Sequence, residues 1–160
     1  MSKIDVDQTV RDLEAGKTPE WITEHLRIYR ESGGAEGHMW DSSAAGSSGL
    51  LPALLLTTVG RRSGEKRTSP LIYGTVGDKF IIIGSKGGAN THPNWYHNLL
   101  AKPDVELQVG KEWFIARARV AKGKERQQLW EHMLTVYPPY KDYQQKTKRE
   151  IPVIVLERQR

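Results

Sequence analysis

The 160-residue sequence contains no cysteine, which excludes disulfides, thiolate nucleophiles, iron–sulfur clusters and cysteine-based zinc sites. Its longest apolar run, residues 50–56, is interrupted by Pro52 and is far shorter than the ~20 residues that a membrane-spanning helix needs. The amino terminus carries acidic residues where a secretory signal requires an apolar segment. We therefore expect a cytoplasmic protein, and peripheral attachment to the inner face of the cell membrane is left open.

Several familiar catalytic motifs are also missing. There is no Gly-x-x-x-x-Gly-Lys-Ser/Thr loop, no Gly-x-Gly-x-x-Gly after a strand and no Gly-x-Ser-x-Gly turn, which excludes Walker, Rossmann and nucleophile-elbow sites. Among five histidines only His92 and His97 are close in sequence, and on a helix this spacing turns them about 140° apart. We therefore expect no metal site and solvated histidines.

What the sequence does have is a concentrated positive charge. The whole chain carries 24 Lys and Arg against 19 Asp and Glu, a net charge of +5, which favours an anionic partner. Residues 60–67 hold four of these cations, Arg61, Arg62, Lys66 and Arg67, against one acid, Glu65. This basic turn predicts a binding site, because scattered charge would indicate only solubility.

The first 49 residues are expected to form an N-terminal region of their own. Apolar residues recur at helical spacing before Gly16 and again after Pro19, which predicts two short amphipathic helices. Residues 33–49 are rich in Gly, Ser and Ala and carry Met39 and Trp40, which is typical of a mobile connector.

From residue 50 to residue 160 the apolar pattern is that of a strand-rich domain. Strands are expected over residues 50–59, 68–76, 80–83, 105–109, 113–120 and 151–156. Helices are expected from Pro93, over residues 124–136 and around Tyr143. Strands in meander order with inserted helices predict an α+β fold whose antiparallel sheet closes into a barrel.

A second anion-binding segment follows the apolar strand that ends at residue 83. Ser85 and Lys86 supply a hydroxyl and an ammonium, and Gly87 and Gly88 let the backbone approach a ligand closely. The segment precedes the amino end of the helix that Pro93 opens, where free N–H groups favour negative charge. Two such elements at neighbouring strand ends predict one anion site.

Four segments in this order resemble the deazaflavin-dependent nitroreductase family. They are TTVGRRSG at 57–64 with Arg67, GSKGG at 84–88, PNWYHNL at 93–99, and YPPYKDY at 137–143 followed by Ile151 and Pro152. The resemblance covers about residues 50–157. It implies a split β-barrel that uses reduced coenzyme F420, a 5-deazaflavin with a phosphate and a polyglutamate tail, and that passes a hydride to quinones, enones or lactones, or nitroaromatic compounds.

The resemblance also implies roles for particular residues. The coenzyme-binding set is Arg61, Arg62, Arg67, Ser85, Lys86, Gly87, Gly88, Pro93 and Trp95. The set beside the acceptor, from which a catalytic hydrogen-bond or proton donor would come, is Ser85, Tyr137, Tyr140 and Tyr143. The hydride donor is the coenzyme's own carbon, so the protein needs to supply only position and electrostatics. Related split barrels often pair as homodimers, and the first 49 residues are expected to cap the active site, with Met39 and Trp40 as acceptor contacts.

Three alternatives remain open at this point. The tyrosines recur every three residues, a spacing that is also typical of helix packing. The barrel could bind FMN, which has one phosphate and no polyglutamate tail. A polyanion-binding barrel without enzymatic activity is a third reading, but nucleic acid is not expected, because the basic residues cluster at one turn and no aromatic-interleaved RNA motif occurs.

Overall fold

The structure is a computed structural model that describes residues 3–159. Its helices are α1 (Val6–Glu14), α2 (Glu20–Glu31), α3 (Asn94–Ala101), α4 (Gly123–Val136) and α5 (Tyr140–Gln145), with two short 3-10 helices, η1 (Ser42–Ala45) and η2 (Lys86–Gly88). Its strands are β1 (Met39–Asp41), β2 (Leu50–Val59), β3 (Lys66–Ile72), β4 (Gly74–Val76), β5 (Lys79–Ile83), β6 (Asp104–Val109), β7 (Glu112–Val120) and β8 (Val153–Arg158). No helix among the described residues is long and apolar enough to cross a bilayer.

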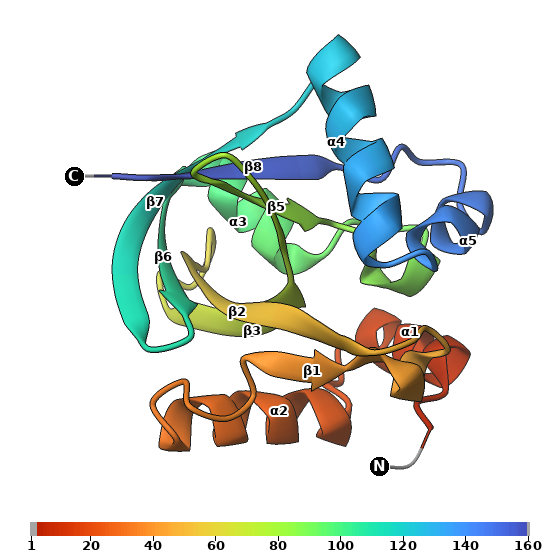
Figure 1. Cartoon of the computed structure of the whole chain (residues 1–160), viewed down its shortest axis with the longest axis horizontal. Helices are drawn as coiled ribbons and strands as arrows, with labels where there is room; N and C mark the ends of the chain where they lie inside the picture. Colours follow the sequence, from red (N-terminus) through yellow and green to blue (C-terminus); the bar gives the residue numbers. More distant parts are fainter. Residues whose placement is uncertain (1–2, 160) are drawn as a thin grey trace.

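The strands form one antiparallel sheet that curls into a barrel (Figure 1). Its order is β1-β2-β6-β7-β8-β5-β4, and β3 pairs with the other edge of β2. In the described chain no pairing joins β3 to β4 or β5, so the barrel is split along this line. The β2–β3 turn and the end of β5 therefore both lie at the split, which brings the two predicted anion-binding segments toward one opening.

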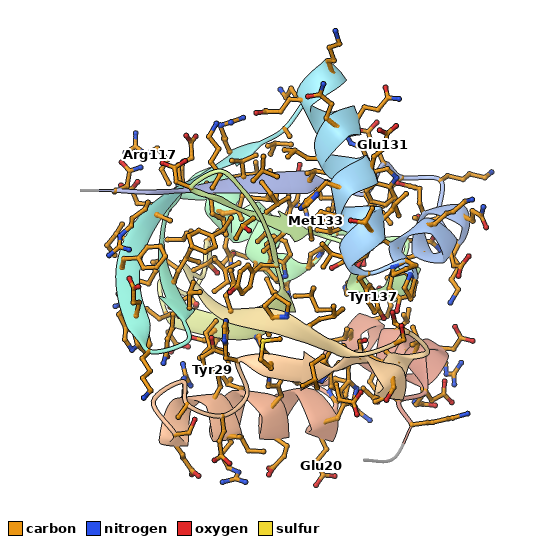
Figure 2. The ribbon with its side chains drawn as sticks, viewed as in Figure 1. Glu20, Tyr29, Arg117, Glu131, Met133 and Tyr137 are labelled. Carbon is orange, nitrogen blue, oxygen red and sulfur yellow. The ribbon has the colours of Figure 1, made fainter. Side chains whose placement is uncertain are left out.

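Two apolar layers hold the sheet. Leu54, Leu107 and Ile154 are fully buried inside the barrel, and further aliphatic and aromatic side chains from the strands and from α3 fill the rest of this layer. On the other face, α4 and α5 pack against β5 and β8 through a second buried cluster that includes Ile81 and Met133. Figure 2 shows Met133 on the side of α4 that faces the sheet, whereas Glu131 lies on the other side. Strand β5 is therefore buried on both faces, which explains why residues 80–83 are all apolar.

Helix α2 lies along β1 (Figure 1), and Tyr29, labelled in Figure 2, is one of the side chains that anchor it. Tyr29 is fully buried; its hydroxyl donates to the Ala53 carbonyl oxygen at 2.9 Å and accepts from the Gly110 N–H at 2.8 Å. Burial raises the pKa of Tyr29 to about 12, so the hydroxyl stays protonated. Because one tyrosine links β2 to the β6–β7 turn, α2 is fixed in place over the opening of the barrel.

The sequence expectations fail at two points of the fold. The strand expected over residues 68–76 is two strands, because the chain turns at Tyr73 and leaves β2 to pair with β5. Residues 33–49 are not a structureless connector, since β1 pairs with β2 and η1 follows it directly. A three-residue strand among Gly, Ser and Ala gives no alternating apolar pattern, so composition alone could not reveal β1.

Candidate functional site

One cavity of about 920 Å³ opens at the split of the barrel. Its walls come from α1, α2, β1, the β2–β3 turn, β3, the end of β5, α3 and the α4–α5 junction. Of the predicted site residues, Arg61, Arg62, Arg67, Ser85, Lys86, Gly87, Pro93, Trp95, Tyr137, Tyr140 and Tyr143 line it. Gly88 does not, and lies buried behind the wall with the backbone of Tyr143 2.8 Å from the position of an added Cβ. The two predicted anion-binding segments thus share one cavity.

The basic turn presents exposed guanidinium groups on a closed backbone. The Gly60 N–H donates to the Glu65 carbonyl oxygen at 2.7 Å and closes the turn. Arg67 pairs with the Glu65 carboxylate at 3.1 Å, and both side chains are more than 60% exposed, so this ion pair contributes little to stability. A bound anion can therefore replace Glu65 as the partner of Arg67 at small cost.

Asn98 on α3 fixes the beginning of this turn, and sequence reasoning did not assign it a role. Its side chain is 3% exposed, and its Oδ1 accepts from the Arg61 N–H at 3.1 Å and from Arg61 Nη1 at 3.0 Å. Its Nδ2 donates to Thr58 Oγ1 at 3.1 Å. A buried amide that satisfies both backbone and guanidinium positions Arg61 at the cavity wall. The motif that contains Asn98 was visible in the sequence, but its partner across 37 residues was not.

The segment after β5 exposes backbone donors to the cavity. Ser85 is in the right-handed region, with φ −76° and ψ −39°, and Lys86, at φ +48°, is the one non-glycine residue with positive φ among residues 3–159. Successive right-handed and left-handed residues form a concave nest, in which consecutive N–H groups point toward one anion. The N–H groups of Ser85, Lys86 and Gly87 have no hydrogen-bond partner within residues 3–159. The segment can therefore bind an electron-rich oxygen through its backbone.

The Lys86 ammonium is held beside this nest. Its Nζ donates to Thr91 Oγ1 at 3.1 Å, and that hydroxyl lies 3.0 Å from a carboxylate oxygen of Glu14 on α1. Helix α1 also packs against the nest from outside, because Val10 would lie 2.8 Å from a Cβ added to Gly87. The first helix thus covers the segment that sequence reasoning assigned to the coenzyme.

Three tyrosines from the α4–α5 junction line the cavity beside the nest (Figure 2 labels Tyr137, at the end of α4). The hydroxyl groups of Tyr137 and Tyr143 lie 2.8 Å apart, and burial raises the pKa of each above its usual value. One hydroxyl proton of this pair is used between the two rings, so one remains to be donated. Burial also raises the pKa of Tyr140, whose hydroxyl has no hydrogen-bond partner in the described part of the chain. All three are neutral hydrogen-bond donors at physiological pH.

An aromatic wall lines the cavity from the side of α2 and β1. The rings of Trp21 and Trp40 stack at 5.8 Å between centroids with 24° between their planes, and His25 stacks on Trp40 at 6.4 Å and 12°. Trp21 Nε1 donates to Thr9 Oγ1 at 3.1 Å, which joins α2 to α1. Trp40 therefore lines the cavity as expected, whereas Met39 does not and is 48% exposed. Sequence reasoning assigned no role to Trp21, which lies in the helix predicted after Pro19.

The histidines are not simply solvated, contrary to the sequence expectation. His92 lies before α3 rather than on it, so its ring comes within 5.7 Å of the His97 ring, centroid to centroid. Burial, and then the nearby Arg149, lower the pKa of His92; burial, Arg61 and Lys86 lower that of His97. Both imidazoles are therefore neutral near pH 7. The described residues contain no group of three or more His, Asp or Glu side chains that could hold a metal ion.

Comparisons with known proteins place the chain in a family. The F420H2-dependent quinone reductase family matches residues 21–158. An F420H2-dependent quinone reductase of Mycobacterium tuberculosis is 39% identical over 137 residues, which cover 84% of this chain and 87% of that protein. A solved F420H2-dependent reductase is 42% identical with a TM-score of 0.62, covering 66% of this chain and 94% of that one. A solved structure described as a domain-swapped dimer is 37% identical with a TM-score of 0.65, covering 86% and 98%.

These matches confirm the split-barrel fold and the oxidoreductase class that the motif order predicted. They also overturn the reading of a polyanion-binding barrel without enzymatic activity. The guanidinium groups and the backbone nest that share the cavity fit a ligand with several anionic groups. The chain belongs to the F420H2-dependent quinone reductase family, whose cofactor is coenzyme F420.

Proposed function

We propose that this protein passes a hydride from reduced coenzyme F420 to a quinone or a similar planar, electron-poor acceptor such as an enone, a lactone or a nitroaromatic compound. The observation that carries the proposal is that one cavity is lined both by a cationic set, the basic turn and the nest, and by an aromatic set, the stacked tryptophans and the three tyrosines. The bound coenzyme supplies the hydride, which carries two electrons, and one further proton completes the conversion of a quinone to a hydroquinone.

On the cationic side, the residues of the chain bind the coenzyme and orient it. Arg61, Arg62 and Arg67 pair with the phosphate and glutamate carboxylates of the coenzyme, since guanidinium forks match such oxyanions in two-point contacts. The nest at Ser85 and Lys86 receives a further oxygen of the coenzyme. Pro93, Trp95 and the backbone at Gly87 complete this side.

On the aromatic side the chain holds the acceptor and stabilises charge. Trp21 and Trp40 offer flat surfaces for a planar ring. Tyr140, or the pair of Tyr137 and Tyr143, donates a hydrogen bond to the acceptor oxygen on which negative charge develops as the hydride arrives. Their raised pKa values keep these hydroxyl groups protonated for that role, and the Ser85 hydroxyl supports them more weakly.

The N-terminal region completes the site as a cap. Residues from α1, α2 and β1 line the cavity, and α1 rests on the nest through Val10 near Gly87. Such a cover excludes water, which strengthens the interactions inside the cavity. We assign residues 1–49 this capping role and residues 50–160 the binding of the coenzyme.

Association with a second copy is supported by one relative and by one surface. A 37% identical solved structure is described as a domain-swapped dimer. Here Trp113 and Ile115 on β7 are 58% and 45% exposed and form an apolar patch. We expect light scattering to give the mass of a dimer and Trp113→Glu to give that of a monomer; a monomeric parent protein would contradict the proposal.

Contact with a membrane surface is supported by the β1–β2 hairpin. Met39 and Leu50 are 48% and 61% exposed, and Trp40 between them lines the cavity. An acceptor with an apolar tail could enter from a lipid surface at this point. We expect the protein to float with anionic vesicles, and Met39→Ser with Leu50→Ser to abolish flotation. A parent protein that stays with the soluble fraction would refute this contact.

The test of the proposed function is anaerobic mixing of the protein with reduced coenzyme F420 and a quinone, following the return of the oxidised deazaflavin absorbance. We expect saturable oxidation of the coenzyme, and Tyr140→Phe, which removes one hydroxyl and keeps the ring, to slow turnover about 10- to 100-fold. Reaction with reduced FMN at an equal rate, or a yellow purified protein that retains FMN, would support the flavin alternative instead.

A further inference from the structure

Arg149, in the segment between α5 and β8, donates four hydrogen bonds to the 84–92 region. Its Nε donates to the Ala89 carbonyl oxygen at 2.7 Å, its Nη2 to the Ser85 carbonyl oxygen at 2.8 Å, and its Nη1 to the Gly84 carbonyl oxygen at 3.2 Å. Nη1 also lies 3.1 Å from His92 Nδ1, which accepts because an arginine can only donate. One guanidinium thus joins both ends of the segment that forms the nest.

These bonds fix which way the peptide groups of the nest face. In a trans peptide the C=O and the N–H point in opposite directions. The carbonyl groups of Gly84 and Ser85 point to Arg149, so the N–H groups of Ser85 and Lys86 point away from it. Ser85, Lys86 and Gly87 line the cavity, whereas Arg149 does not. The guanidinium therefore holds the back of the nest and leaves its donors to a ligand.

The surroundings of Arg149 fix its backbone and leave its guanidinium to the nest. Its own backbone is fixed by Gln144, whose Nε2 donates to the Arg149 carbonyl oxygen at 2.7 Å and whose Oε1 accepts from the Ile151 N–H at 2.9 Å. Among the described residues no carboxylate forms an ion pair with Arg149, so its donors go to carbonyl oxygens and one imidazole. Lys86 at φ +48° is a strained conformation for a residue with a Cβ, and such strain persists only where the surroundings hold it.

We propose that Arg149 is the positioning residue of the nest: it sets the orientation of the 84–86 peptide groups so that their N–H groups bind an oxygen of the coenzyme. The inference rests on the proposed function for the identity of the ligand, but not for the geometry. Nothing in the chain's motifs pointed to it, because Arg149 is more than 55 residues from its partners in sequence.

The test compares Arg149→Gln and Arg149→Lys with Arg119→Gln as a matched control. Arg119 also makes several guanidinium contacts, to Glu125 and Glu157, but it lies outside the cavity lining. Two quantities are measured on the intact protein: the dissociation constant for coenzyme F420, from its fluorescence, and the hydrogen exchange rates of the Gly88 and Ala89 amides without ligand. These amides donate to the Ser85 and Lys86 carbonyl oxygens, so they report the order of the nest.

We expect Arg149→Gln to weaken coenzyme binding about 10- to 100-fold and to speed exchange of both amides, because several charge-assisted hydrogen bonds are lost. Arg149→Lys has one ammonium and no planar fork, so its coenzyme affinity and amide exchange rates should lie between those of the parent protein and of Arg149→Gln. If Arg149→Gln does not fold, Arg149→Lys provides the test. Arg119→Gln should lower the unfolding midpoint and change neither quantity. The inference is overturned if Arg149 variants keep both parental values, or if Arg119→Gln changes both equally. Failure of the parent protein to bind the coenzyme would refute the proposed function, and amide exchange alone would then decide the role of Arg149.

Discussion

The basic turn and the nest face the same cavity but offer an anion two different kinds of contact. Arg67 and its neighbours are exposed side chains that can move and that salt screens. The nest consists of backbone N–H groups at Ser85 to Gly87, which are held from behind by Arg149 and covered by α1. We therefore expect the turn to attract and capture the coenzyme and the nest to fix its position. Hydride transfer needs the second, because the reacting carbon of the coenzyme must be placed accurately.

The largest effect on coenzyme affinity is expected from substitutions in the basic turn. Arg61→Ala combined with Arg67→Ala should weaken coenzyme binding about 1000-fold, since each charge-assisted contact contributes about 1.5–3 kcal/mol. Fluorescence titration at two salt concentrations measures it. The parent protein should lose affinity as salt rises, and the double variant, which keeps Arg62 and Lys86, should lose less. Equal salt dependence in both proteins would show that the turn does not hold the anionic groups.

The second prediction compares one glycine from each region. Gly88→Ala should lower the free energy of unfolding by about 3 kcal/mol, because φ is +88° and the added Cβ meets the Tyr143 carbonyl oxygen at 2.8 Å. Gly64→Ala in the basic turn should cost about 1 kcal/mol, since φ is +73° but nothing lies within 4 Å. Denaturant unfolding measures both. Similar losses in the two variants would mean that the nest is no more rigid than the turn.

A smaller effect on stability and on coenzyme affinity is expected from Asn98, which positions the basic turn. Asn98→Ala removes the acceptor for the Arg61 N–H and guanidinium and leaves Thr58 without its donor. We expect a loss of about 1–2 kcal/mol in unfolding free energy and of about fivefold in coenzyme affinity. Calorimetry and titration on the same sample provide the two numbers. An unchanged affinity would show that Arg61 does not need this support.

The smallest expected effect is a pH dependence of the free energy of unfolding. The folded pKa values of His92 and His97 lie below 6.5, so the unfolded chain binds their protons first as pH falls. Their contribution to the free energy of unfolding is present above pH 6.5 and is lost as pH drops through this value toward the folded pKa. Urea unfolding at a series of pH values should show this fall, and His92→Gln with His97→Gln should reduce it. A double variant with the parental slope would contradict the assignment.

The sequence was sufficient for what short-range patterns and side-chain chemistry encode. Most strands, the helices and the basic turn followed from apolar spacing and charge, and the motif order led to the family. The sequence was insufficient where a structural feature depends on contacts between residues far apart in the chain. The strand β1, the Asn98 contact to Arg61 and the hydrogen bonds of Arg149 depend on residues far apart in the chain. The left-handed conformation of Lys86 was equally invisible, because the sequence there suggests that only the glycines adopt positive φ.

The measurement that tests the shared cavity most directly is the affinity for whole coenzyme F420 relative to a deazaflavin without phosphate and glutamates. Fluorescence titration gives this ratio for the parent protein, for Arg61→Ala with Arg67→Ala, and for Arg149→Gln. We expect the parent to prefer the whole coenzyme at least about 100-fold. The turn variant should lose most of this preference. Arg149→Gln should weaken binding of both ligands and keep the preference, because the oxygen that we expect at the nest is one of the deazaflavin ring, which both ligands carry. A parent ratio near one, or an equal loss in both variants, would contradict the account.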